Sequence, residues 1–145
     1  MRKIILTLLI CSLSTSSQAD LFTAKYHDCY DGDTCTVDLL RNETKGYAVP
    51  HFFGQRVKIR FSGIDTAEIR GKCIKEKILA KAAKEFTKKQ LSNAKKIFID
   101  TDKVDSFGRY VGVIYADDRI NSINQMLLNN DLAVIEKKGY NDWCS

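Results

Sequence analysis

The sequence has little proline and no stretch typical of a flexible linker. Pro50 is the only proline among 145 residues, and the chain has no internal repeats, low-complexity tracts or Pro/Gly-rich segments. A chain of this length without a linker is suited to one domain with a modest core. These absences argue against a repeat protein and against two domains joined by a linker.

Histidine is scarce, and no cysteine spacing of the zinc-binding kind occurs. His27 and His51 are the only histidines, and neither lies near residues suited to metal or nucleophilic chemistry. The five cysteines match no zinc pattern. Histidine-based catalysis and a structural zinc site are therefore not expected. The net charge of +5, which falls to +3 without the two basic residues at the N-terminus, allows an anionic partner without requiring one.

The first 19 residues have the pattern of a secretory signal peptide. Two basic residues precede an apolar run from Ile4 to Leu13, and a small-x-small end follows at 17–19. The run is too short to span a bilayer, so a retained membrane anchor is the weaker interpretation. Cleavage before Asp20 removes two basic residues, leaving 126 residues with a net charge of +3. We therefore expect an exported protein, periplasmic or secreted.

Four cysteines remain after such cleavage, and an even set in an exported chain predicts disulfides. They are Cys29, Cys35, Cys73 and Cys144, which allow three pairings. Cys29 and Cys35 lie symmetrically about Gly32, so in a hairpin they would face each other across the two strands. We favour this bond together with a second one between Cys73 and Cys144.

Strand patterns dominate the first half of the mature chain. An Asp-Gly turn separates the first two patterns and predicts a hairpin. In the third pattern, Val57, Ile59 and Phe61 alternate with basic residues. A short last strand is predicted at 132–136. The five longer strands are expected at residues 21–29, 33–40, 56–64, 95–100 and 109–117.

Two helices complete the pattern. The first is predicted from Ile74 to Leu91, because Ile74, Ile78, Ala82 and Phe86 recur every four residues as an apolar face. The second is predicted at 121–130. Five strands grouped three and then two, with two helices, fit a small α+β domain built on a closed or nearly closed five-stranded barrel. We assign residues 20–145 to this domain.

Two aspartates lie at the ends of predicted strands. Side chains alternate along a strand, and Asp33 falls on the inward side of its strand. Asp65 falls on the same side as Val57, Ile59 and Phe61, unless a bulge at 62–63 breaks the alternation. Both would meet at the barrel rim, where bare carboxylates repel each other and a calcium ion would relieve the repulsion. The alternative is that the first aspartate only belongs to a hairpin turn and the second only caps a helix.

Basic and acidic residues near these aspartates favour phosphate chemistry. Arg60 precedes Asp65, and Arg109 follows a glycine in the last long strand pattern. A guanidinium matches phosphate oxygens with two parallel hydrogen bonds. Glu68, three residues beyond Asp65, offers a spare carboxylate that could orient or deprotonate water. A cation, two arginines and a free carboxylate are the components that phosphodiester hydrolysis requires.

Three short blocks together resemble the signature blocks of the staphylococcal nuclease (thermonuclease) family. They read DGDT at 31–34, RFSGIDTAE at 60–68 and FGRYVGVIYAD at 107–117, in the family's order and with a helix between the last two. The resemblance runs from about Phe22 to Glu136. It implies an OB-type Greek-key β-barrel with two main helices, in which the family's third, C-terminal helix is short or absent.

The resemblance also implies roles for single residues. Asp33 and Asp65 match the family's calcium-binding carboxylates, and Thr66 matches the residue that gives a backbone carbonyl to the ion. Ca²⁺ is therefore the expected cofactor. None of these three positions departs from the family's pattern.

The remaining matches concern the substrate. Glu68 matches the carboxylate assigned as general base, or alternatively as a group that positions water. Arg60 and Arg109 match the phosphate-binding pair. Phe107 replaces a tyrosine that reaches the nucleotide's phosphate, so a hydrogen bond is lost while an apolar surface for the substrate remains.

We therefore expect an exported calcium-dependent nuclease that hydrolyses DNA and RNA with little sequence specificity and leaves 3′-phosphate ends. Single-stranded or locally opened nucleic acid is the expected substrate, the mature protein is expected to be monomeric, and no membrane contact is expected after signal cleavage. The alternatives are a non-catalytic OB-type module that only binds nucleic acid, and a secreted protein-binding domain. Retention of the acidic residues and both arginines argues for catalysis.

Overall fold

The computed structural model of the chain describes residues 18–50 and 56–145, except for the side chain of Asp102. The predicted signal peptide lies almost wholly outside these residues, as does His51. The elements in chain order are β1 (Asp20–Asp31), β2 (Thr34–Asn42), β3 (Tyr47–Ala48), β4 (Arg56–Phe61), β5 (Ile64–Asp65), α1 (Ile74–Asn93), β6 (Ile97–Val104), β7 (Tyr110–Ala116), α2 (Ile123–Asn129) and β8 (Val134–Ile135).

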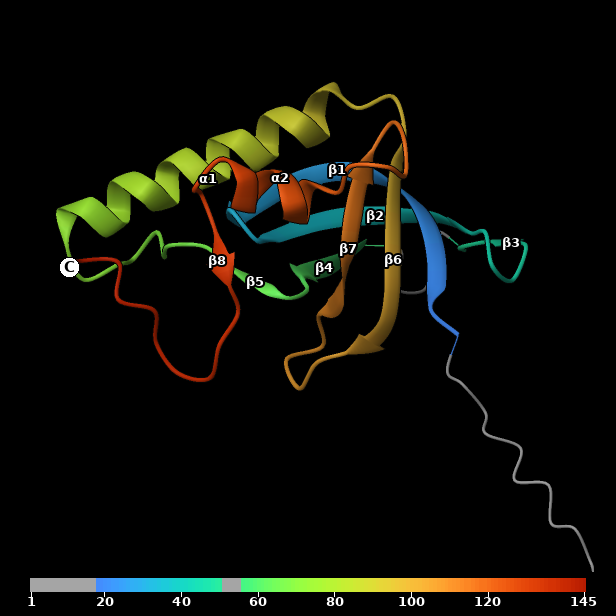
Figure 1. Cartoon of the computed structure of the whole chain (residues 1–145). Coiled ribbons are helices and arrows are strands. Elements are labelled where there is room, and N and C mark those ends of the chain that lie inside the picture. The colour runs from blue at the N-terminus through green and yellow to red at the C-terminus, as the bar shows by residue number, and fades with distance from the viewer. Residues whose placement is uncertain (1–17, 51–55) are drawn as a thin grey trace, which may run out of the picture.

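Five strands close into a barrel, as Figure 1 shows. Their order around it is β1, β6, β7, β4 and β2, and a pairing of β1 with β2 completes the ring. The pair β4–β7 is parallel, and the other neighbours are antiparallel. The short β3 extends β2 at the edge. The α+β fold with a closed five-stranded barrel, predicted from the sequence, is confirmed.

Alternating apolar residues fill the barrel. On β2, Cys35, Val37 and Leu39 are buried, and on β4 Ile59 and Phe61 are 0% and 1% exposed. Because side chains alternate between the faces of a strand, these residues share the inner face. Cys35 is opposite Cys29 in the β1–β2 register, and the two form a disulfide, which confirms the pairing expected from a hairpin.

Helix α1 lies across the barrel, but its buried face is not the predicted one. Ile74 and Ile78 are 78% and 63% exposed. A Cβ atom on Gly32 would lie 2.6 Å from the Cβ of Ala83, so the helix and the β1–β2 turn approach too closely for larger side chains. The hydroxyl of Thr87 donates to the Gly32 carbonyl at 2.7 Å. Small and polar residues therefore form most of the buried face, which consists of Glu76, Ala80, Ala83, Thr87 and, at its end, Leu91.

The end of β4 also differs from the prediction. Ser62 and Gly63 form a turn, in which Gly63 has φ +74°, so the strand does not continue in phase. As a result Ile64 is buried at 2% exposure, and Asp65 is only half-buried. The buried amide of Asn124 on α2 fixes this turn by donating to the Ser62 carbonyl at 3.0 Å.

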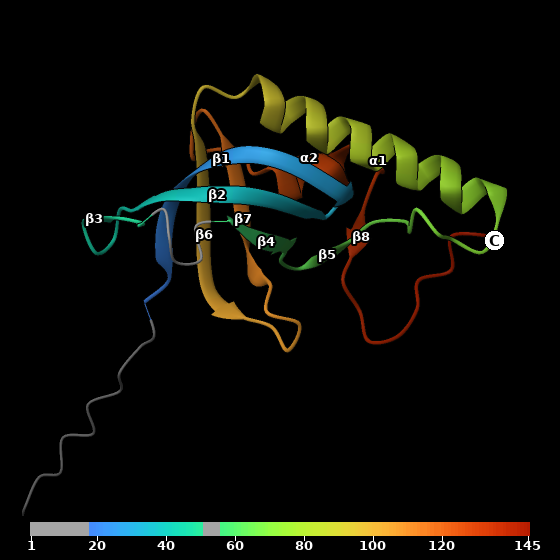
Figure 2. The same ribbon diagram turned by 180° about the vertical axis from the view of Figure 1, so that it is seen from behind.

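The chain returns to the start of α1 after α2. The predicted strand at 132–136 is reduced to β8, which pairs with β5 outside the barrel. No helix follows α2 within residues 130–145, in agreement with a missing third helix. The C-terminus lies beside the start of α1 in both views (Figures 1 and 2), where Cys144 and Cys73 form a disulfide. Among the helices in the described part of the chain, none has the length and apolar character to span a membrane.

Candidate active site

The centre of the candidate site is Arg60, which forms ion pairs with both Asp33 and Asp65. The side chain of Arg60 is only 14% exposed and that of Asp33 8%. Burial opposes a charged guanidinium, but the two carboxylates raise the pKa of Arg60 above its ordinary value. The structure thus brings together three residues that the sequence placed at two strand ends.

Asp33 is held at the rim by three hydrogen bonds, two of which come from backbone amides in β4 and in the loop after β5. The backbone amide of Thr66 donates to its Oδ2 at 2.8 Å, and the amide of Phe61 donates to its carbonyl at 2.8 Å. The Thr34 hydroxyl donates to its Oδ1 at 3.1 Å. These bonds place the carboxylate of Asp33 against the loop that follows Asp65. The alternation of inward and outward residues along β4 does not extend to Asp65, but the turn after β4 brings its carboxylate to Arg60, which also pairs with Asp33.

Asp31 is a site residue that sequence reasoning missed. The sequence pattern assigns it only to the Asp-Gly turn between the first two strands, although it shares the Asp-Gly-Asp pattern with Asp33. Its side chain is buried, and its Oδ1 has no hydrogen-bond partner among the described residues. Burial, followed by the charge of Asp33, raises the pKa of Asp31 to about 7. Two carboxyl groups therefore lie close together at the rim, and the ionised form of Asp31 is disfavoured there.

Glu68 lies in the loop between β5 and α1, and its side chain is exposed. Partial burial and then the nearby charge of Asp33 raise its pKa, while Arg60 opposes the shift. The Glu68 carbonyl accepts a hydrogen bond from the amide of Gly71 at 2.8 Å. An accessible carboxylate with a raised pKa, next to a buried arginine, is suited to accept a proton from water.

Within the described part of the chain, Arg109, the second arginine of the predicted phosphate-binding pair, does not contact the cluster of Arg60, Asp33 and Asp65. The Nε of Arg109 donates to Asp105 at 2.7 Å, and its guanidinium lies 5.3 Å from the centre of the Phe107 ring. Among the described residues, no direct contact links Arg109 to Arg60, Asp33 or Asp65. Phe107 is 82% exposed at the tip of the β6–β7 loop.

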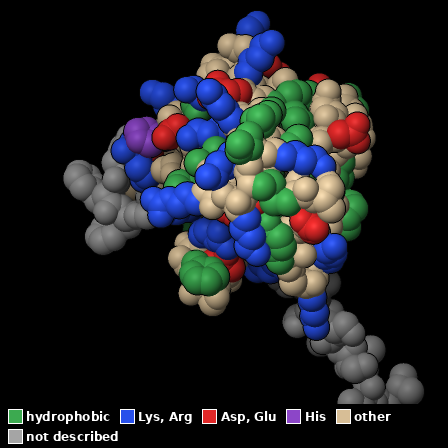
Figure 3. Space-filling view, turned by 90° about the vertical axis from the view of Figure 1, so that its left-hand side faces the viewer, with side chains coloured by type: hydrophobic (Ala, Val, Ile, Leu, Met, Phe, Trp, Pro, Cys, Tyr) green, Lys and Arg blue, Asp and Glu red, His purple; other side chains and the backbone are tan. Residues whose placement is uncertain are grey.

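Basic side chains surround the face where α1 begins. Lysine and arginine side chains predominate over acidic ones on this face of the molecule (Figure 3). The first turn of α1 supplies Lys75 and Lys77, and Lys72 lies two residues before the helix; all three are exposed. Such a surface attracts a polyanion without reading its bases.

A model of the family described as staphylococcal nuclease homologue matches residues 58–143. The match covers more than half of the chain. The chain belongs to the staphylococcal nuclease family. Members of this family are nucleases, hydrolases whose substrates are nucleic acids, and they are typically metal-dependent. The matched range includes Arg60, Asp65, Glu68 and Arg109, while Asp33 lies before it.

The acidic residues of this family member fit a hard divalent cation. Asp31, Asp33 and Asp65 offer oxygen atoms only, which is the donor type that calcium prefers. The Oδ1 of Asp31 and the hydroxyl oxygen of Thr66 are buried without a hydrogen-bond partner among the described residues. The pKa of Asp31 is raised first by burial and then by the charge of Asp33, and a bound cation would offset that charge.

Two further residues of this site gave no usable signal in the sequence. Asn141 donates from its amide to Asp65 Oδ2 at 2.7 Å, across 76 positions of the chain. Glu76 is fully buried and accepts from the amide of Lys72 at 2.7 Å. Glu76 is not among the residues of the predicted apolar face of α1, so its spacing gave no reason to expect burial. Its second partner, the hydroxyl of Tyr140 at 2.9 Å, lies 64 positions away in the chain, and only the fold brings the two together.

Proposed function

We propose that this protein is an exported, calcium-dependent nuclease that hydrolyses phosphodiester bonds in DNA and RNA with little sequence specificity, leaving 3′-phosphate ends. The observation that carries the proposal is the buried Arg60 paired with Asp33 and Asp65 at the barrel rim, with Glu68 near enough for their charges to shift its pKa. Family membership supports the same class of reaction.

Calcium would be held by the carboxylates of Asp33 and Asp65 and by the backbone carbonyl of Thr66. When bound, the ion would supply positive charge to the scissile phosphate. Glu68 orients and deprotonates the attacking water, because its carboxylate is accessible and its pKa is raised. Arg60 donates hydrogen bonds to phosphate oxygens as negative charge increases on them.

Arg109 and Phe107 form the second part of the substrate site. We infer that Arg109 exchanges its ion pair with Asp105 for a phosphate, since the pair is partly exposed and a guanidinium binds either anion with two hydrogen bonds. The exposed ring of Phe107 supplies an apolar contact to the nucleotide. Single-stranded or locally opened strands would reach both residues.

The proposal includes export. Residues 1–19 would be removed as a signal peptide, and residues 20–145 would act as a monomer in the periplasm or outside the cell. The two disulfides support an oxidising location.

The test is digestion of DNA and RNA by the oxidised mature protein, with calcium or with chelator. Glu68→Gln should lower kcat about a thousandfold, because a general base contributes about 10²–10⁴. Glu85→Gln, which removes an exposed carboxylate from the middle of α1, is the matched control and should leave kcat unchanged. End-group analysis of the products should find 3′-phosphates.

Cleavage that persists with chelator and in Glu68→Gln would refute the assigned site. No cleavage, together with DNA binding that weakens as salt rises, would place the protein among non-catalytic OB-type binding modules.

A further inference from the structure

The last twelve residues, 134–145, form what we call the C-terminal segment, and it contacts the candidate site at several points. It begins with β8, which pairs with Ile64 and Asp65 of β5. The amide of Glu136 then donates to the Gly63 carbonyl at 3.0 Å. The segment finally crosses to the start of α1 (Figure 2). It therefore follows the chain on which Asp65, Thr66 and Glu68 are placed.

Asn141 makes the most direct of these contacts. Its amide nitrogen donates to Asp65 Oδ2 at 2.7 Å, while the other oxygen of Asp65 is paired with Arg60. Asn141 is 8% exposed, although its neighbours in the segment are mostly exposed. A buried amide that donates to one oxygen of a carboxylate fixes the rotation of that carboxylate. Asp65 is thus oriented from both sides.

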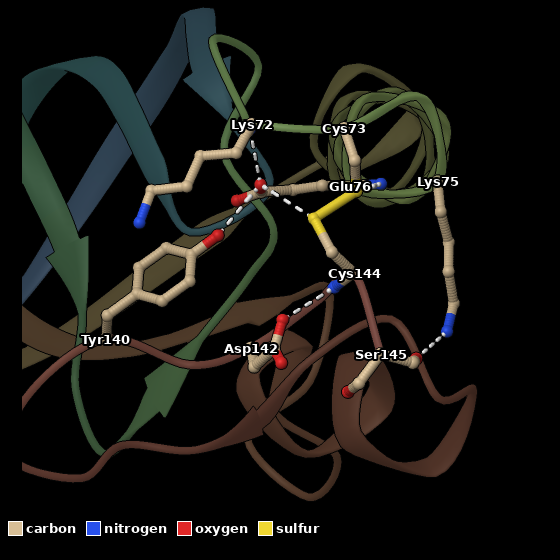
Figure 4. The surroundings of a disulfide bond; sticks show 8 residues. All are labelled: Lys72, Cys73, Lys75, Glu76, Tyr140, Asp142, Cys144 and Ser145. Carbon is tan, nitrogen blue, oxygen red and sulfur yellow. Dashed lines mark hydrogen bonds between the residues drawn. A yellow bond between two sulfur atoms is a disulfide. The ribbon is translucent and has the colours of Figure 1, made fainter.

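Tyr140 makes a second contact, to the loop that carries Glu68. Its hydroxyl donates to Glu76 Oε2 at 2.9 Å, and the same oxygen accepts from the amide of Lys72 at 2.7 Å (Figure 4). The ammonium of Lys72 lies 3.9 Å from the centre of the Tyr140 ring. A Cβ atom on Gly71 would lie 2.4 Å from the side chain of Glu76, so loop and carboxylate are tightly packed.

Two peripheral contacts add to these: the ammonium of Lys75 donates to the Ser145 carbonyl, and a carboxylate oxygen of Glu136 lies 3.9 Å from the guanidinium of Arg60. The C-terminal segment has one strand, of two residues, and most of its side chains are exposed.

The bond between Cys144 and Cys73 joins the end of the segment to the residue that caps α1. Cys144 is exposed and Cys73 half-buried, whereas Cys29 and Cys35 are each 1% exposed. A thiol reductant therefore reaches the Cys73–Cys144 bond and not the one inside the barrel.

We propose that Asn141 is a positioning residue for Asp65, and that the Cys73–Cys144 bond, by holding the C-terminal segment on the site, makes nuclease activity depend on oxidation of this chain. The inference rests on the proposed function. It predicts that the protein gains full activity only after the bond has formed, and so after export. Before export, nucleic acid of the producing cell would be exposed to a weakened enzyme.

The redox step is an ordinary thiol–disulfide exchange. A dithiol such as dithiothreitol attacks one sulfur of the Cys73–Cys144 bond, and the mixed disulfide is then resolved by the reagent's second thiol. Two electrons and two protons are transferred, so that the protein ends with two thiols and the reagent with a cyclic disulfide. Oxidation reverses the change.

The first test replaces Asn141 by leucine, which has a similar size and no amide donor. We expect calcium to bind about tenfold more weakly by calorimetry, because a hydrogen bond to a charged group is lost, and kcat to fall at least tenfold with little change in KM. Asn121→Leu, at an exposed position before α2, is the matched control. Unchanged calcium affinity and unchanged kcat in Asn141→Leu would overturn the positioning role.

The second test compares the wild type, Cys73→Ser/Cys144→Ser and Cys29→Ser/Cys35→Ser with and without dithiothreitol. Thiol alkylation followed by mass spectrometry identifies which bond is reduced. Reduction should lower wild-type kcat at least tenfold, and reoxidation should restore it. Cys73→Ser/Cys144→Ser should have a low kcat that dithiothreitol does not change. Cys29→Ser/Cys35→Ser should still lose activity on reduction, provided that circular dichroism shows it to be folded. Full activity with Cys73 and Cys144 reduced would overturn the proposal.

Hydrogen exchange separates a positioning effect from loss of the fold, and it needs no substrate. On reduction we expect faster exchange in residues 64–76 and 134–145, with protection of β1, β2 and β7 retained. Loss of protection throughout the barrel would show that the bond only stabilises the fold, and would overturn the proposal. A wild-type protein that neither binds calcium nor cleaves nucleic acid would instead refute the proposed function, and this inference with it.

Discussion

The two disulfides lie in regions that are stabilised in different ways. Cys29 and Cys35 are opposite each other in the β1–β2 register, six positions apart in sequence and buried in the barrel. Cys73 and Cys144 are 71 positions apart and join an exposed segment to the start of a helix. In the chain-entropy view, the short loop contributes about 2 kcal/mol and the long one about 4 kcal/mol.

The difference shows that the two halves of the candidate site depend on different forces. Asp33 and Arg60 are placed by a closed ring of strands around apolar side chains. Asp65 and Glu68 are carried by the chain after β4, whose outer contacts come from the C-terminal segment. Burial stabilises the first half, and a covalent bond with a few polar contacts stabilises the second.

The sharpest way to test this comparison is to truncate one isoleucine in each region. Ile59→Ala, in the barrel core at 0% exposure, should lower the free energy of unfolding by about 4 kcal/mol, because it leaves a cavity. Ile135→Ala, in β8 at 67% exposure, should change it by less than about 0.5 kcal/mol. Urea denaturation of the oxidised proteins measures both. Similar losses in the two variants would contradict the comparison.

A smaller effect is expected on the barrel side of the site, at Asp31. Burial and the charge of Asp33 raise its pKa from 3.8 to about 7 in the folded protein. Between these two pH values the carboxyl ionises more readily in the unfolded chain, so ionisation lowers the free energy of unfolding. A shift of this size corresponds to about 4 kcal/mol, and screening by solvent at the barrel rim reduces the effect. Stability should therefore fall by roughly 3 kcal/mol as pH rises from about 4 to about 7, and stay level above. Asp31→Asn should remove this dependence.

Urea denaturation in chelator, in steps between pH 4 and pH 8, measures the Asp31 effect. Asp118→Asn, at an exposed aspartate in the turn after β7, is the matched control and should follow the wild type. An Asp31→Asn variant with the wild-type pH dependence would show that Asp31 is ionised without penalty.

The smallest effect is expected on the segment side, at Glu76. Burial alone would raise its pKa, but the backbone amide of Lys72 and the Tyr140 hydroxyl lower it below 4.5. Its contribution is therefore present above about pH 4.5 and is lost as pH falls through the lowered pKa. Glu76→Gln should cost about 2 kcal/mol at pH 7, the value of hydrogen bonds to a charged group.

Stability of Glu76→Gln and the wild type, measured from pH 7 to pH 3, should converge at low pH. Tyr140→Phe, which removes only the phenol donor, should show part of the same loss. A constant difference at all pH values would mean that the carboxylate of Glu76 is not ionised in the folded protein.

Much of the barrel could be predicted from local patterns. The alternation of Val57, Ile59 and Phe61, and the Asp-Gly turn between two strand patterns, depend on neighbours in the sequence, and both gave the observed elements. The apolar face of α1 could not be predicted in this way. Ile74 and Ile78 have the right spacing, but close approach to Gly32 favours alanine and threonine on the buried face.

The site was predicted in part. The ends of β2 and β4 place Asp33 and Arg60 together, because neighbouring strands fix their spacing. Asp65 reached the site by another route than its parity implied, since the turn at Gly63 breaks the alternation. Asn141 could not have been found, because its contact with Asp65 requires the course of the whole C-terminal segment.

Residue type and short spacing were enough to predict the barrel strands, the cysteine pairing in the hairpin and the identity of the charged groups. Which of these charges meet follows from the packing of segments that are distant in the chain. Arg60 lies between two carboxylates, and Asn141 and Tyr140 contact the acidic residues Asp65 and Glu76, because strand pairing and a long-range disulfide bring distant segments within hydrogen-bond distance. Hydrogen bonds and ion pairs act over a few ångströms, so contacts between residues that are far apart in the sequence depend on the folded course of the chain.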